Sequence, residues 1–350
     1  MSGREPGARH PRALCFPAPS LYNAPTMVRV VFMGSPEFAI PSLRTLHAHY
    51  KVAGVISQPD RPAGRGRRPL EPPVKRVARD LGIATMQPAT LRASDVMPVL
   101  RAWAPDIIIV AAFGRILRPE MLDLPRFGCL NVHASLLPRH RGAAPIPAAI
   151  LAGDSETGAT IMQMDAGLDT GRIVAQRSDP ISADDTASSL SERVARLGAQ
   201  LLADTLPGYL AGDIVPVPQD ESRATYARQL RKHDGRLDWT RPADELARRV
   251  RAYNPWPGAF TSWHGEPLKL LRVRPAPSGS ADPGAVFLIG GEVAIGTGHG
   301  ALVVAQLQPA GRRPMSAGDF VRGAPDFVGA TLVSNPTTQL RTQPVPISHP

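Results

Sequence analysis

The chain has 350 residues, of which 40 are Lys or Arg and 30 are Asp or Glu, so its formal net charge is +10. This length predicts two domains, because a domain usually contains about 100–200 residues. The two cysteines exclude a disulfide framework and a cysteine-rich metal site. No run reaches the roughly 18 apolar residues of a membrane helix, so the basic charge predicts an acidic partner such as nucleic acid rather than a membrane.

The two ends of the chain carry no repeating hydrophobic pattern. We interpret residues 1–26 as a disordered or misannotated extension, because Met27 directly precedes the first strand pattern. An organellar import signal in this segment is the less favoured alternative. Residues 333–350 are rich in proline and polar residues, which predicts a disordered tail. We therefore expect a cytoplasmic protein of bacterial type.

From residue 27 to residue 214, short apolar runs alternate with helical patterns, which predicts an α/β domain with a parallel sheet and helices on both faces. At the end of the first run, Ser35 is expected to cap a helix and Pro36 to occupy its first position. The three-glycine fingerprint of dinucleotide binding is missing there, so a nicotinamide dehydrogenase is disfavoured. Strands are expected at 28–33, 52–57, 106–112, 129–134 and 159–165, and helices at 36–49 and 72–82.

Two segments are strongly basic: residues 61–79 hold seven basic residues against Glu71 alone, and residues 223–251 hold nine against four acidic residues. A solvated helix or loop face is the ordinary explanation for such charge. The first segment fits a phosphate-binding loop better, because glycines between its arginines suit a loop that orders on phosphates. These arginines are Arg61, Arg65, Arg67 and Arg68.

Polar residues stand at the carboxyl end of the fourth expected strand, at the edge where open α/β sheets bind ligands. Strand alternation places Asn131 and His133 on the same side, where an amide donor and an imidazole could face one reacting carbonyl. A core histidine at a capped strand end is the structural alternative, and the pair alone leaves both open.

A second motif, DAGLDTG at residues 165–171, follows the fifth expected strand. Taken alone, such a string is more often an Asx-rich turn than a site. Together, Asn131, His133 and Asp169 at two neighbouring strand ends match the needs of acyl transfer to an amine. That reaction requires an oxyanion donor, an acid or base and a carboxylate that orients it.

The second half of the chain changes pattern. Apolar residues from Leu190 to Leu201 form one helical stripe, which breaks at Pro207, and we expect a linker over 215–233. Residues 234–332 contain short apolar runs between Gly- and Pro-rich turns, typical of a small antiparallel β domain. These runs cover 268–274, 285–289, 292–295 and 301–307. Tryptophans 239, 256 and 263 could stack on exposed bases, although Trp256, between two prolines, is interpreted as a packing residue.

The strings NVHASLLPRHRGAAPI (131–146) and TIMQMDAGLDTG (160–171) resemble the catalytic domain of the folate-dependent formyltransferase family, whose members use 10-formyltetrahydrofolate. Three further strings are similar to the family members that formylate methionyl initiator tRNA: QPDRPAGRGRR (58–68), YNPWPG (253–258) and LQPAG (307–311). The resemblance extends from residue 27 to about residue 332.

The resemblance implies a Rossmann-like catalytic domain followed by an OB-like barrel that binds tRNA. The substrates would be 10-formyltetrahydrofolate and methionyl initiator tRNA, with no metal, and we expect a monomer. Asn131 and a protonated His133 would donate to the oxyanion, and Asp169 would keep the imidazole charged. Arg61, Arg65, Arg67 and Arg68 would address the tRNA. The folate pocket would be formed by Phe113, Gly114, Arg115, Ile116, Leu117, Ser135, Leu136, Leu137, Pro138 and Asp165.

Two rival functions are weighed against this hypothesis. A formyltransferase acting on an amino sugar or a purine precursor would need neither the basic segment 61–68 nor the β-rich part 234–332. A non-catalytic RNA-binding protein would not need the intact set of Asn131, His133 and Asp169.

Overall fold

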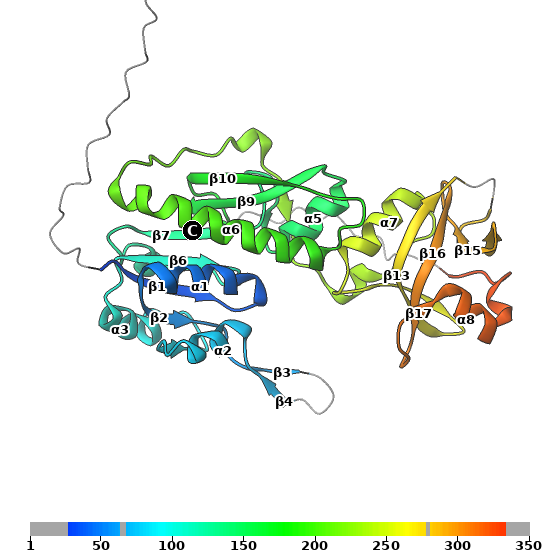
Figure 1. Cartoon of the computed structure of the whole chain (residues 1–350), viewed down its shortest axis with the longest axis horizontal. Helices are drawn as coiled ribbons and strands as arrows, with labels where there is room; N and C mark the ends of the chain where they lie inside the picture. The colour runs from blue at the N-terminus through cyan, green and yellow to red at the C-terminus, as the bar shows by residue number, and fades with distance from the viewer. Residues whose placement is uncertain (1–26, 64–67, 278–280, 334–350) are drawn as a thin grey trace, which may run out of the picture.

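The computed structural model describes residues 27–63, 68–277 and 281–333, which form an α/β part and a β-rich part (Figure 1). The expected extension at residues 1–26, the arginines Arg65 and Arg67, and residues 334–350 of the expected tail lie outside this description. The predicted fold class, a mainly parallel α/β domain followed by an antiparallel β-rich domain, is confirmed. The expected domain boundaries stay a prediction.

Seven strands form the sheet of the α/β part, in the order β10-β9-β7-β6-β1-β2-β5. Five of them run parallel, but β9 pairs antiparallel with β7, and β10 pairs antiparallel with β9. The expectation that the strand at 159–165 belongs to a parallel sheet is therefore wrong in its direction, and β10 was not predicted. A buried apolar run has the same pattern in either direction, so the sequence could not reveal the reversal. The strands are β1 (Arg29–Gly34), β2 (Lys51–Ile56), β5 (Thr85–Met86), β6 (Ile107–Ala111), β7 (Cys129–His133), β9 (Glu156–Gln163) and β10 (Ile173–Pro180).

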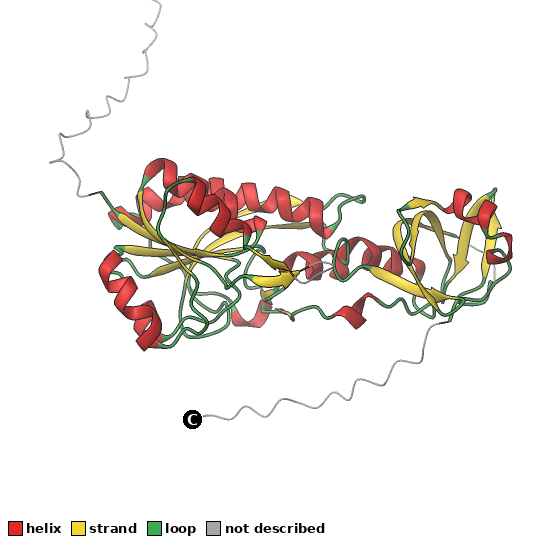
Figure 2. Cartoon of the chain, turned by 90° about the horizontal axis from the view of Figure 1, so that it is seen from below, coloured by secondary structure: helices red, strands yellow, loops and turns green. Residues whose placement is uncertain are grey.

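Helices cover both faces of the sheet (Figure 2). Along β1, Val30 and Phe32 belong to one core cluster, whereas Val31 and Met33 belong to another. This division explains why the strand is apolar throughout. The first cluster includes residues of α1 (Ile40–His49), α2 (Pro73–Asp80), α5 (Pro145–Ala152) and α6 (Ala187–Ala211). The second includes residues of α3 (Ala93–Trp103) and α4 (Pro119–Leu122).

The turn after β1 differs from its prediction. Pro36, not Ser35, precedes the short 3-10 helix Glu37–Ala39 that leads into α1, and no side chain caps it. The Ser35 hydroxyl instead accepts a hydrogen bond from the backbone N–H of Gln58. The turn is tight because a Cβ on Gly34 would lie 2.8 Å from the carbonyl oxygen of Ala111 on β6. Ser35 therefore ties the ends of β1 and β2 together.

Helix α6 begins with a capping box in which the Thr186 hydroxyl accepts from the backbone of Ser189. Its predicted stripe is confirmed, since Leu190, Val194 and Leu201 are buried. The expected break at Pro207 is wrong, because the helix continues through this proline to Ala211. Tertiary packing supplies most of the stability of such a helix, so its apolar face outweighs the single unfavourable residue.

The connecting segment, residues 213–233, does not leave the α/β part directly. Its strand β11 (Tyr226–Ala227) pairs in parallel with β8 (Arg141–Gly142), which follows β7 in the chain. The short 3-10 turns Glu221–Arg223 and Lys232–Gly235 flank β11. The connecting segment therefore lies along the α/β part before the chain enters the β-rich part.

The β-rich part contains an antiparallel sheet in the order β12-β13-β16-β15-β14, with β17 paired to β16. The expected strands of this domain are all found, and β12, β17 and the two helices were not predicted. The strands are β12 (Ala259–Trp263), β13 (Glu266–Ala276), β14 (Val286–Ile289), β15 (Glu292–Gly296), β16 (Ala301–Pro309) and β17 (Met315–Ser316), and the helices are α7 (Ala243–Ala252) and α8 (Ala317–Gly323).

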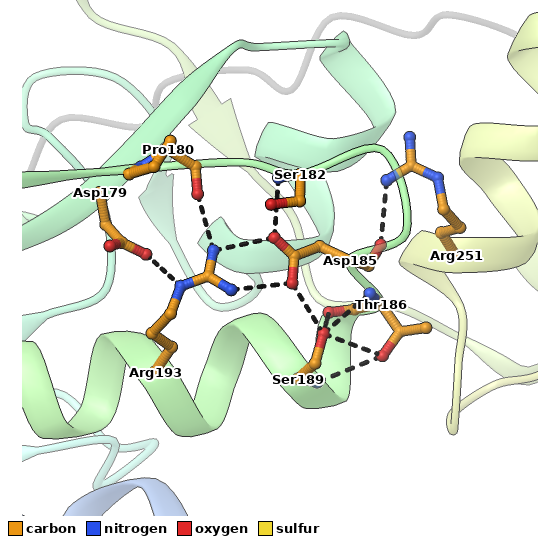
Figure 3. A network of polar contacts seen from close by, with 8 residues as sticks. All are labelled: Asp179, Pro180, Ser182, Asp185, Thr186, Ser189, Arg193 and Arg251. Carbon is orange, nitrogen blue, oxygen red and sulfur yellow. Dashed lines mark hydrogen bonds and ion pairs between the residues drawn. The ribbon is translucent and has the colours of Figure 1, made fainter.

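Helix α7 joins the two parts. Leu246 and Val250 lie in the core of the β-rich part, whereas Tyr253, just after the helix, packs into the core of the α/β part. Near the end of α7, the guanidinium of Arg251 donates to the carbonyl oxygen of Asp185 at 2.9 Å. Figure 3 shows this contact at the start of α6, where Asp185 also binds Arg193. The junction is thus a packed interface with its own polar network.

We expect Asp185→Asn to lower the free energy of unfolding by about 2–4 kcal/mol, because its carboxylate is the shared acceptor of this network. It accepts from the backbone of Ser182 at 2.8 Å, from the Ser189 hydroxyl at 2.9 Å and from two nitrogens of Arg193 at 2.9 and 2.8 Å. Hydrogen bonding from Arg193 lowers the pKa of Asp185. The stabilisation is therefore present above the usual carboxyl pKa and is lost as the pH falls through the lowered value.

Urea unfolding at neutral and acidic pH measures this effect, and the difference between Asp185→Asn and the parent should shrink as the pH is lowered. The control is Asp204→Asn on the same helix, whose exposed carboxylate binds Arg177 and Gln200. An exposed pair of this kind contributes at most about 1 kcal/mol. Equal effects of the two substitutions would contradict a stabilising role for the Asp185 network.

Candidate active site

A cavity of about 1280 Å³ opens at the carboxyl ends of β1, β6 and β7. From β1 the chain proceeds to β2 and β5 on one side and later to β6 on the other, so this edge is the topological switch point of the sheet. Open α/β sheets bind ligands in the crevice at such a point. The volume exceeds the roughly 300–1,000 Å³ of ordinary ligand pockets, which leaves room for two substrates.

The structure brings Asn131, His133 and Asp169 together on the wall of this cavity. The amide nitrogen of Asn131 lies 3.4 Å from Oδ1 of Asp169, and Nδ1 of His133 lies 3.7 Å from Oδ2. Asn131 and His133 are 9% and 5% exposed, so both are nearly dehydrated. His133 is buried, as the structural alternative required, but it faces a carboxylate on the wall of a cavity.

Asp169 is not positioned in the way that the sequence predicted, at the end of a neighbouring strand. Because β9 is antiparallel to β7, the carboxyl ends of these strands lie at opposite edges of the sheet. The long loop between β9 and β10 carries Asp169 back instead, and the backbone N–H of Gly142 fixes its Oδ2 at 2.8 Å. Asp169 has a φ of 53°, in the left-handed region that residues other than glycine rarely adopt. The loop, rather than a strand end, therefore places the carboxylate.

The hydrogen bonds of His133 define its tautomer. Nε2 lies 3.0 Å from the carbonyl oxygen of His140, which can only accept, so Nε2 carries a proton and Nδ1 faces Asp169. Burial lowers the pKa of His133, and the opposing influence of the Asp169 carboxylate is smaller. This direction favours a neutral imidazole whose Nδ1 can accept a proton, rather than the protonated His133 that was expected. The protonation state of His133 therefore stays a prediction.

The expected folate-pocket residues divide into two groups. Six of them line the cavity: Phe113, Gly114, Arg115, Ile116, Leu117 and Asp165. The loop after β6 that carries five of these is held by Gln58, whose side chain donates to the carbonyl oxygen of Phe113 at 2.7 Å. Ile116 is 70% exposed, so the loop offers an apolar side chain to a ligand.

The turn of Ser135, Leu136, Leu137 and Pro138 does not line this cavity, and its expected role in binding folate stays a prediction. Two of its backbone groups bind a side chain of β9. The hydroxyl of Thr160 donates to the carbonyl oxygen of Ser135 at 2.6 Å and accepts from the backbone of Leu137 at 3.2 Å. These two hydrogen bonds attach the turn to β9.

The first basic segment separates into two structural elements. Arg61 and Arg68 belong to a hairpin of β3 (Arg61–Ala63) and β4 (Arg68–Leu70), while Arg65 and Arg67 lie between these strands, outside the described residues. On α2, by contrast, Lys75 pairs with Asp60 at 2.9 Å and Arg79 pairs with Glu71 at 2.8 Å. The helical half of the segment fits the ordinary explanation of a solvated face.

The tryptophans reverse their predicted roles. Trp239 is 1% exposed, and Trp263 packs edge-on against Phe320 and Phe327, so both are packing residues. Trp256, interpreted as a packing residue, is 54% exposed and lies on the cavity wall. Its neighbours on the wall include Gln229 and Leu230 of the connecting segment. Sequence patterns missed this end of the cavity because it is assembled from segments far apart in the chain.

Two absences hold for the described ranges of the chain. No helix there is both long enough and apolar enough to cross a membrane. No group of three or more His, Cys, Asp or Glu side chains in those ranges is arranged to hold a metal ion.

Comparison with known proteins gives a consistent picture. Residues 28–206 match the formyl transferase family model, and residues 229–325 match the model for the formyl transferase C-terminal domain. A methionyl-tRNA formyltransferase from Halorhodospira halophila is 50% identical over 84% of this chain and 96% of its own length. One from Citrifermentans bemidjiense is 48% identical over 85% of this chain and 94% of its own.

Solved structures with lower identity share the fold. WlaRD, a sugar 3N-formyl transferase, is 18% identical, with a TM-score of 0.59 over 82% of this chain and 99% of its own. HypX from Aquifex aeolicus, solved with tetrahydrofolic acid, is 19% identical, with a TM-score of 0.57 over 86% of this chain and 48% of its own.

Proposed function

This chain belongs to the formyl transferase family, and from that premise we propose that it transfers the formyl group of 10-formyltetrahydrofolate to the α-amine of methionyl initiator tRNA, for translation initiation. The observation that carries the proposal is the cavity, where Asn131, His133 and Asp169 meet. Its wall includes Trp256 next to the β-rich part, so a substrate can contact both parts of the chain. The relatives that match this chain over 94% and 96% of their own length are methionyl-tRNA formyltransferases.

The three polar side chains have distinct roles in this reaction. The amide nitrogen of Asn131 donates to the formyl oxygen, which gains negative charge when the amine adds to the carbon. Neutral His133 accepts the proton that the amine loses, at Nδ1, and returns it to N10 of the folate as the C–N10 bond breaks. Asp169 stabilises the imidazolium that forms between these two steps.

The pocket residues fit a folate. The loop with Phe113, Ile116 and Leu117 offers apolar surface for the flat part of the molecule, and Arg115 offers a cation near its acidic end. The Arg115 side chain is held at 3.1 Å from the carbonyl oxygen of Pro88. These residues bind and orient the co-substrate, and the buried histidine and asparagine then face its formyl group.

The rival function is formylation of an amino sugar or a purine precursor. The test compares kcat/KM for three acceptors: charged initiator tRNA, an amino-sugar nucleotide and glycinamide ribonucleotide. The formyl donor is 10-formyltetrahydrofolate in each assay. We expect a measurable rate only when charged tRNA is the acceptor. A rate with either small substrate that matches or exceeds the tRNA rate would favour the rival.

Arg65→Ala tests the basic segment separately from the chemistry. If Arg65 binds a tRNA phosphate, the variant should have a lower kcat/KM for charged tRNA and an unchanged folate affinity. The log–log slope of tRNA affinity against salt should also flatten by about one unit, since one phosphate is no longer neutralised. Arg79→Ala is the matched control, because Arg79 is exposed on α2 and pairs with Glu71. Unchanged affinity, salt slope and turnover in Arg65→Ala would remove this arginine from the tRNA site.

A further inference from the structure

The connecting segment contacts the catalytic loop through Gln219. The amide nitrogen of Gln219 donates to the carbonyl oxygen of Asp169 at 2.8 Å and to that of Gly171 at 2.7 Å. Gln219 is half-buried and is separated from Asp169 by 50 positions in the chain. These hydrogen bonds hold the backbone on both sides of Thr170, directly beside the catalytic carboxylate.

Arg141 holds Gln219 in turn. The Arg141 side chain is fully buried, and its Nε and Nη2 donate to Oε1 of Gln219 at 3.0 and 2.8 Å. Its Nη1 and Nη2 also donate to the carboxylate of Glu221, at 2.9 and 2.7 Å. The guanidinium can only donate, so the oxygen of the Gln219 amide must face Arg141. The nitrogen of the amide therefore faces the loop.

These contacts close a ring around Asp169. Arg141 binds the side chain of Gln219, Gln219 binds the Asp169 backbone, and the Asp169 carboxylate accepts from the N–H of Gly142, the residue after Arg141. The backbone of Arg141 also binds the connecting segment, because its N–H donates to the carbonyl oxygen of Thr225, just before β11, at 2.8 Å. Residues 165–168, before Asp169, are exposed. Within the loop, Oδ1 of Asp165 accepts from the backbone of Gly167 at 3.0 Å and from the Thr170 hydroxyl at 2.7 Å, and the ring adds contacts that join Asp169 to the rest of the fold.

We propose that Gln219, oriented by Arg141, is a positioning residue that sets the Asp169 carboxylate against His133 and Asn131. The inference rests on the proposed function. Asp169 needs such a hold because its left-handed backbone is unfavourable for a residue with a side chain. Its contacts with His133 and Asn131 are long, at 3.7 and 3.4 Å, so a small displacement of the backbone would break them.

The test compares Gln219→Met with Gln219→Glu in the full chain. Methionine keeps the length of the side chain but removes both the donors and the acceptor. Glutamate keeps the acceptors for Arg141 and cannot donate to the two carbonyl oxygens. If positioning of Asp169 matters, both variants should lose kcat by about 10- to 100-fold. The dissociation constants for folate and for charged tRNA should stay within about twofold, since neither ligand site is touched.

A second readout follows the charge next to His133. Two titratable groups face its imidazole: the Asp169 carboxylate, which raises its pKa, and His140, whose ring charge lowers it and whose carbonyl accepts from Nε2. A displaced Asp169 should let the pKa of His133 fall. The limb of the kcat–pH profile that follows His133 should therefore move to lower pH in Gln219→Met. A purely structural role for Gln219 would leave this limb in place.

The matched control is Gln200→Met, at an exposed glutamine on α6 whose amide binds Asp204. It should leave kcat and the pH profile unchanged. Parent-like kcat in both Gln219 variants, or a loss of kcat without movement of the pH limb, would overturn the positioning role. Parent protein that fails to formylate charged initiator tRNA would instead refute the proposed function, so the two failures are distinguishable.

Discussion

Asp169→Asn is expected to lower kcat for formyl transfer by a factor on the order of 10³, with the fold and folate binding retained. The Asp169 carboxylate accepts from Gly142 through one oxygen and faces the amide nitrogen of Asn131 with the other. An asparagine can present only one acceptor atom, so its NH₂ group must face one of these two donors. It also cannot neutralise the imidazolium of His133 when the amine proton is transferred.

Single-turnover formylation of charged tRNA measures this loss without interference from product release. The control is Asp204→Asn, the same chemical change at an exposed carboxylate of α6, which should leave the rate unchanged. Calorimetric titration with folate checks that the pocket persists. A rate within a few-fold of the parent would show that the Asp169 charge is not used in the reaction.

Asn131→Ala is expected to lower kcat by about 10²–10³-fold, because it removes a buried donor to the developing oxyanion. Asn131 lies on β7, in register with Met162 of β9, so the rigid sheet fixes its position. Because the interaction strengthens as charge develops, KM for folate should change much less than kcat.

The double variant, Asn131→Ala with Asp169→Asn, provides the internal control. Residues that act as a unit are not additive in their effects, so the double variant should lose less than the product of the two single losses. A double variant that loses the full product would show that the two side chains act independently. An Asn131→Ala variant with parent-like kcat would exclude the oxyanion role.

Patterns of burial predicted five of the seven strands of the sheet and missed the two edge strands, β5 and β10. The run from Val30 to Met33 divides between two cores, and this two-sided burial is what a continuous apolar pattern reports. The same pattern holds no information on strand direction, which is why the reversal of β9 was missed. The sequence nevertheless singled out Asn131, His133 and Asp169, which the fold brings together at one cavity, because their types match one chemistry and their strings resemble one family. Their catalytic roles stay a prediction.

Features that depend on contacts between distant segments were not predictable. The side chain of Ser35 matches a helix cap by its sequence position, but it binds Gln58, 23 positions away. The prolines on both sides of Trp256 led us to predict a packing residue. Trp256 is instead exposed, and it lines the cavity together with residues of the connecting segment. Gln219 lies in a segment without any pattern, and only the fold brings it to Asp169.

The protonation state of His133 also required the structure. The sequence shows an imidazole two positions after Asn131, but only the structure shows that Nε2 faces the carbonyl oxygen of His140 and that burial lowers the pKa of the ring. These two observations favour a base that first accepts a proton over the cation that the sequence led us to expect.

Product analysis of the formyl-transfer reaction tests the central claim most directly. The full chain is incubated with 10-formyltetrahydrofolate labelled in the formyl carbon and with methionyl initiator tRNA, and the amino acid is then released from the tRNA by mild base. The account predicts that the label appears in N-formylmethionine, that its formation requires both substrates, and that Asp169→Asn slows its formation by a factor on the order of 10³. The absence of labelled N-formylmethionine with the parent chain, or equal labelling by Asp169→Asn, would contradict the account.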